Sequence, residues 1–75
     1  MEIYVKLPSG MTIVVECDEG DTFIDIENYI RDRYEINGFL TLNYIVMEKY
    51  DILTYSKYGN KNFHFIKKKD LVKQN

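Results

Sequence analysis

The chain of 75 residues carries a formal net charge of −2, with 45% hydrophobic and 29% charged residues. This length allows one domain with a small core, and the composition is that of a folded protein rather than a disordered one. The acidic balance argues against a nucleic-acid-binding protein. The lack of a long apolar run argues against a membrane-spanning protein, and the single cysteine, Cys17, cannot form an internal disulfide.

Residues 1–7 and 11–17 predict a β-hairpin. In both runs apolar and polar residues alternate, so each strand turns one face toward a core. Pro8-Ser9-Gly10 predicts the connecting turn, because Gly10 can adopt the positive φ that a short hairpin loop needs. The expected inward positions are Ile3, Val5, Ile13, Val15 and Cys17.

A helix is predicted after Asp21. Thr22 is the expected N-cap, and Asp25 three residues later forms a capping-box pattern. Asn37-Gly38 is expected to end the helix, because both residues tolerate the left-handed conformation. The apolar stripe at helical spacing comprises Phe23, Ile26, Ile30 and Tyr34.

Residues 40–46 return to the alternation of a strand, but their register is open. In one register Tyr44 is exposed. If Leu42 belongs to the core instead, Tyr44 shares its inward face and Ile45 is the exposed residue, because a slip of one position exchanges the two faces.

Residues 62–68 predict the last strand. Its inward positions are Phe63 and Phe65, and its outward positions are His64, Ile66 and Lys68. A hairpin, a helix and further strands pack best when the helix covers one face of a mixed sheet and the last strand lies beside the first. The predicted fold is therefore an α+β β-grasp with four to five strands, formed by residues 1–69. Residues 70–75 are expected to be a flexible tail.

The same segments resemble ubiquitin and the ubiquitin-like domains. The likeness is residue for residue over positions 1–36 and requires a short deletion within residues 51–59. It rests on the joint occurrence of Lys6, Gly10, Asp21-Thr22, Ile30, Ile36 and His64-Phe65-Ile66. The resemblance implies the β-grasp fold that the alternation predicts independently.

The resemblance also implies a partner-binding surface. Ubiquitin-like domains bind proteins through a small apolar patch with a histidine on the exposed face of the sheet. The matching positions are Pro8, Tyr44, His64 and Ile66, with Lys6 and Lys68 around them. For His64 and Ile66 the outward direction also follows from strand alternation. The competing interpretation of His64 is a solvated strand residue without a role.

The function implied by the resemblance is that of a non-conjugated domain that docks proteins of the ubiquitin or proteasome pathway. Binding is expected to be weak and reversible. The chain is expected to be a monomer in the cytoplasm or nucleus. Ubiquitin-like modifiers need terminal glycines, whereas Leu71-Val72 stands in their place. Conjugation is therefore not expected unless the mature tail is not represented. The alternative is a β-grasp adaptor outside ubiquitin pathways, viral or splicing-associated.

Catalysis, a cofactor, a small-molecule substrate and a metal site are not expected. Cys17 and His64 belong to opposite strand faces, so they should not meet as nucleophile and base. The chain has no second histidine and no paired cysteine for a metal. Basic residues gather near the end of the sequence, at Lys67 to Lys69 and Lys73. The favoured interpretation is a solvated surface, and docking to an acidic partner is the next. Nucleic acid comes last, because no aromatic platform accompanies them.

Overall fold

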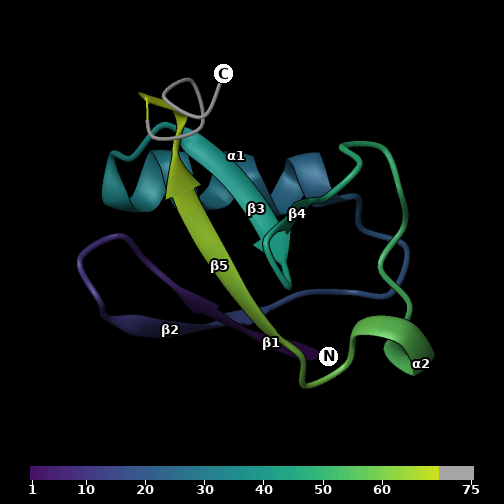
Figure 1. Ribbon diagram of the computed structural model, residues 1–75. Helices are drawn as coiled ribbons and strands as arrows, with labels where there is room; N and C mark the ends of the chain where they lie inside the picture. Colours follow the sequence, from purple (N-terminus) through teal and green to yellow (C-terminus); the bar gives the residue numbers. More distant parts are fainter. Residues whose placement is uncertain (70–75) are drawn as a thin grey trace.

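The computed structural model describes residues 1–69, which form one mixed sheet and two helices (Figure 1). The elements are β1 (Glu2–Lys6), β2 (Thr12–Glu16), α1 (Phe23–Tyr34), β3 (Gly38–Leu42), β4 (Ile45–Val46), α2 (Tyr55–Tyr58) and β5 (Asn62–Lys67). The predicted tail, residues 70–75, lies outside the described residues.

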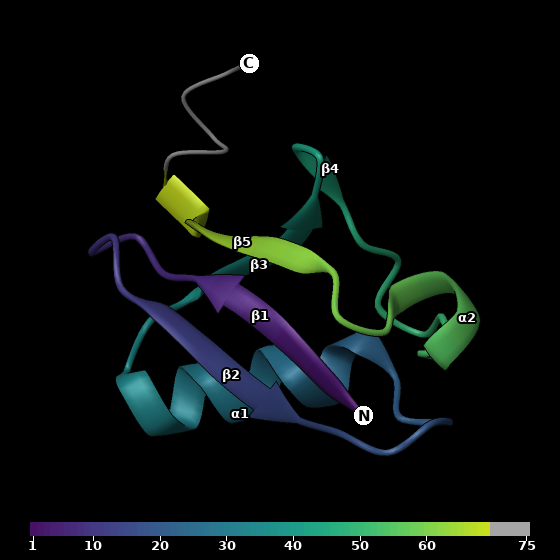
Figure 2. The ribbon, with the colours of Figure 1, turned by 90° about the horizontal axis from the view of Figure 1, so that it is seen from below.

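The five strands follow the order β2-β1-β5-β3-β4, with β5 in the middle of the sheet. β5 runs parallel to β1, and every other neighbouring pair is antiparallel. Figure 2 shows α1 lying against one face of this sheet, while α2 lies beyond the end at which β5 begins. The prediction of an α+β β-grasp fold, with the last strand beside the first, is confirmed.

The core lies between α1 and the inner face of the sheet. All the strand residues predicted to point inward are buried, as are the helix residues Phe23, Ile26 and Ile30. The rings of Phe23 and Phe63 have their centroids 6.0 Å apart, which joins the start of the helix to the central strand. Burial of each such side chain contributes about 1.5–3 kcal/mol to folding.

The helix begins as its sequence predicts. Thr22 is the N-cap and has extended backbone angles. Its N–H donates a hydrogen bond to Asp25 Oδ2 at 3.0 Å, and its hydroxyl donates to the same oxygen at 3.0 Å. The predicted capping box is present, so backbone N–H groups at the start of the helix have hydrogen-bond partners that the helix itself does not provide.

The end of the helix differs from the prediction. Glu35, rather than Asn37-Gly38, takes the left-handed conformation, with φ 57° and ψ 43°, and its N–H donates to the Arg31 carbonyl at 2.8 Å. Gly38 is already part of β3. A Cβ atom at this position would overlap the Ile66 carbonyl oxygen of β5, so the glycine permits close strand approach and does not cap the helix.

The strand predicted over residues 40–46 is wrong in its middle. β3 ends at Leu42, and Asn43 and Tyr44 form a two-residue turn with φ 53° and 66°. Leu42 then pairs with Ile45 across the turn. Positive φ at both central residues is the pattern of a type I′ hairpin turn. Tyr44 and Ile45 are consequently both exposed, at 82% and 66%, and neither of the two continuous-strand registers considered from the sequence describes this segment.

The last strand is one residue shorter than predicted. β5 ends at Lys67, so Lys68 is not an outward-facing strand residue. The Lys68 N–H donates instead to the Asn37 carbonyl at 3.1 Å, which draws the chain toward the segment between α1 and β3. The prediction for Lys68 is wrong because pairing with β3 stops at the Gly38–Lys67 register.

Candidate functional site on the outer sheet face

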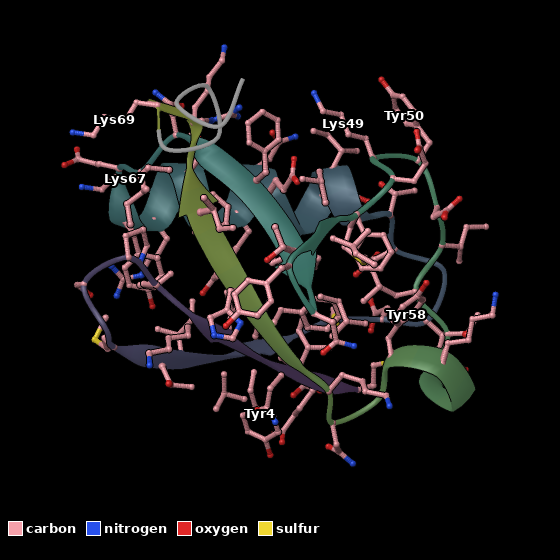
Figure 3. All side chains as sticks on the ribbon, viewed as in Figure 1. Tyr4, Lys49, Tyr50, Tyr58, Lys67 and Lys69 are labelled. Carbon is pink, nitrogen blue, oxygen red and sulfur yellow. The ribbon has the colours of Figure 1, made fainter. Side chains whose placement is uncertain are left out.

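The candidate site lies on the sheet face turned away from α1, which Figure 3 views from the front. Strand register aligns one residue each from β1, β5, β3 and β4 in a row across this face. Lys6 pairs with His64, His64 with Thr41, and Thr41 with Val46. His64 therefore lies on the outer face, between strands β1 and β3.

Tyr44 reaches the same row from the turn after β3. Its ring stacks on the His64 ring with the centroids 5.7 Å apart and the planes inclined by 24°. Thr41, the strand residue next to His64, is completely buried, and its hydroxyl donates to the His64 carbonyl oxygen at 3.0 Å. The aromatic surface here thus combines a turn residue, Tyr44, with a strand residue, His64.

A shallow groove of about 260 Å³ joins these residues to the first hairpin turn. All the site residues predicted from the sequence line it, except Lys68. The lining comprises the predicted Lys6, Pro8, Tyr44, His64 and Ile66, together with Leu7, Gly10, Phe65 and Lys67. Three segments far apart in the sequence therefore converge on one small surface: the β1–β2 turn, the β3–β4 turn and β5.

Lys68 is not part of this groove. It lines a separate hollow beside Asn37 and Gly38, near the end of α1. Lys67 supplies a cationic edge to the outer groove instead. Sequence alternation assigns Lys67 to the inner side of β5. That assignment carries little weight at the last strand position, where Lys67 is exposed.

The tip of the β3–β4 hairpin was missed by the sequence reasoning. Tyr44, Ile45 and Val46 are three consecutive apolar residues exposed by 82%, 66% and 41%. Val46 belongs to the cross-strand row of His64, so this apolar tip adjoins the groove. The available signal was Asn43, a residue that tolerates positive φ and so favours a turn.

Cys17 lies apart from this face. Its thiol is buried, and Sγ donates to the Met1 carbonyl oxygen at 3.5 Å. Burial raises the pKa of the Cys17 thiol, the N-terminal ammonium acts in the opposite direction, and nearby carboxylates add smaller upward contributions. A raised pKa disfavours the thiolate, which is the reactive form of cysteine.

A buried carboxylate, not anticipated from the sequence, supports the inner layer. Glu27 is buried on α1, and its Oε2 accepts a hydrogen bond from the Leu40 N–H at 2.9 Å. Burial raises the pKa of the Glu27 carboxyl, while this hydrogen bond and the charge of Lys49 act in the opposite direction. The contact fixes α1 against β3 and so helps to position the β3–β4 turn.

The fold places the chain in the β-grasp class of α+β domains. No model of a known protein family and no curated protein sequence matches it. Within residues 1–69, no helix has the length and apolar character needed to cross a membrane. The same residues contain no cluster of three or more His, Cys, Asp or Glu side chains suited to a metal ion.

Proposed function

We propose that the chain is a ubiquitin-like protein-interaction domain that docks partner proteins through the outer sheet face. The observation that carries the proposal is the stacked pair of Tyr44 and His64 in a groove lined from three separate segments. Docking is proposed in place of catalysis or conjugation, because the surface combines apolar and aromatic groups with a cationic edge. Such surfaces are typical of protein recognition.

The conformation of Tyr44 supports this role. A non-glycine residue with φ 66° carries a conformational cost of roughly 1–2 kcal/mol. The side chain held there is largely exposed, so its burial contributes little to folding. Tyrosine at a solvent-exposed position beside a groove can bury its ring on a partner at a low cost in side-chain entropy. The strain and the exposure therefore favour a role in binding.

The size of the groove limits the strength of the interaction. A surface of this extent falls in the class of weak and transient contacts, with a few central side chains carrying most of the binding energy. Lys6 and Lys67 lie at its edge and favour a partner with acidic residues around an apolar centre. The proposed partners are proteins of the ubiquitin or proteasome pathway, which present a helix or a groove to such a face.

The proposal is tested by titrating the ¹⁵N-labelled chain with helical ubiquitin-receptor domains and following backbone chemical shifts. The shifts should be largest at Lys6, Tyr44, His64 and Ile66. Changes confined to Tyr4, Thr12 and Val14, which lie on the same sheet face outside the groove, or to α1, would contradict the proposed groove. A chain that binds another protein through the groove, but none of these receptors, would assign it to adaptors outside ubiquitin pathways.

Two substitutions test the groove residues directly. Ile66→Ala and His64→Ala should each weaken partner binding by about tenfold, the effect of a central contact worth about 1.4 kcal/mol. Val14→Ala is the matched control, because Val14 is an exposed apolar residue on the same sheet face and does not line the groove. An equal loss of affinity in Val14→Ala would mean that the partner does not bind through the groove.

A further inference from the structure

A second hollow, of about 330 Å³, lies between α1 and β3, away from the outer sheet groove. Residues with cationic side chains line it from three parts of the chain: Arg31 from α1, Lys49 from the loop after β4, and Lys68, which follows β5. Asn28 and Asn37 add polar side chains to its lining. The proposed docking function makes no use of this surface.

The hollow continues into a neighbouring one at the end of α1. Asn37 and Lys68 line both, and Lys67 and Lys69 add further positive charge beside the second. Figure 3 shows Lys67 and Lys69 at the upper left and Lys49 at the upper right, with α1 and β3 between them. Together the two hollows form an elongated basic strip along this edge of the molecule.

The charge of the strip is opposite to that of the chain. Its cationic residues are Arg31, Lys49, Lys67, Lys68 and Lys69, and its carboxylates are Glu27 and Glu35, which leaves a local charge of +3 in a chain of net charge −2. Asp32, outside the lining, pairs with Arg31 Nε at 3.4 Å. This exposed pair leaves the other guanidinium donors of Arg31 available. The strip therefore attracts anionic groups over an extended length.

We propose that the basic strip binds an extended peptide segment rich in Asp and Glu. The cations are distributed along two connected hollows rather than directed at one point, which fits a row of carboxylates better than a single phosphate. Glu27 lines the first hollow, and its carboxylate would weaken the binding of any anion there, whether phosphate or carboxylate. A nucleic-acid strand is less favoured, because Phe39 is the one aromatic side chain in the lining and is half-buried.

The test uses fluorescence anisotropy with a fluorescein-labelled octapeptide of alternating Glu and Asp, at low salt. The double variant Lys49→Gln/Lys68→Gln should bind about 5- to 20-fold more weakly than the wild type, since each exposed charge pair is worth roughly two- to fivefold. Lys57→Gln/Lys61→Gln is the matched control. It removes the same charge from exposed positions outside the strip and should change the affinity by less than about twofold.

A third variant tests the geometry of the strip. Glu27→Gln keeps an oxygen that can accept the Leu40 N–H and removes the negative charge, so it should tighten peptide binding by about two- to fivefold. Equal weakening in the two lysine double variants would overturn the proposal, because attraction would then depend on total charge alone. Tighter binding of a labelled oligothymidylate than of the peptide would overturn it in favour of nucleic acid.

Discussion

The two faces of the sheet differ in burial, and the residues of β5 show the difference within one strand. Phe63 and Phe65 point toward α1 and are buried, while His64 and Ile66 point outward and are half-buried. The inner residues are constrained by folding, since their apolar area is removed from water when α1 packs on the sheet. The outer residues stabilise the fold less and remain accessible, so the same alternation separates a structural face from the face that we propose for binding.

The largest effect on stability is expected from a substitution at the inner face of the sheet. Phe63→Ala should lower the free energy of unfolding by about 3–5 kcal/mol, because it removes a buried ring and leaves a cavity beside Phe23. Urea denaturation followed by circular dichroism measures the change. Loss of a cooperative transition agrees with the prediction, since 5 kcal/mol is comparable with the whole stability of a small domain. A loss below about 1 kcal/mol would contradict it.

The helix that covers the inner face depends on its first turn. Thr22→Ala should lower the free energy of unfolding by about 1 kcal/mol, because it removes the hydroxyl that binds Asp25 Oδ2. Thr12→Ala, at an exposed strand position, is the control and should stay within about 0.5 kcal/mol of the wild type. A Thr22→Ala melting temperature equal to that of the wild type would show that the cap contributes nothing.

The pH dependence of stability tests the contact between α1 and β3. Burial raises the pKa of Glu27 in the folded chain above its ordinary value of 4.5. As pH rises above 4.5, the unfolded chain releases this proton first, so the free energy of unfolding falls until pH passes the raised folded pKa. Glu27→Gln lacks this loss and can still accept the Leu40 N–H, so its stability relative to wild type should increase over the same interval. A difference in the free energy of unfolding between Glu27→Gln and the wild type that is constant with pH would contradict the raised pKa of Glu27.

The smallest expected change in stability belongs to the outer face. Ile66→Ala should alter the free energy of unfolding by less than about 1 kcal/mol, because the side chain is half-buried and points away from the core. Thermal unfolding by differential scanning calorimetry provides the comparison with Phe63→Ala. Equal losses in the two variants would mean that the two faces are not distinct.

The sequence predicts the inner face well and the second half of the outer face less well. The first hairpin and the stripe of α1 carry strong periodicity, and the structure follows both. The turn at Asn43-Tyr44 lacks the glycine that favours positive φ, and the alternation runs on through it without a break. The sequence therefore predicts Tyr44 for the candidate site but within a strand, whereas its side chain reaches the groove from a turn.

Other differences arise from contacts between distant segments. Gly38 resembles a helix cap in the sequence, but its role depends on the approach of β5 twenty-eight residues later. Glu27 has the character of an exposed helix residue until β3 places the Leu40 N–H against it. Local patterns record neither contact, because both partners are brought together only by the fold.

The central claim is that the groove around Tyr44 and His64 binds the partner. It is tested most directly by Tyr44→Ala, measured for partner affinity by isothermal titration calorimetry and for stability by urea denaturation. Binding should weaken by about tenfold, while the denaturation midpoint stays nearly unchanged, because the ring at 82% exposure contributes little to folding. Wild-type affinity in this variant, or a large loss of stability, would contradict the account.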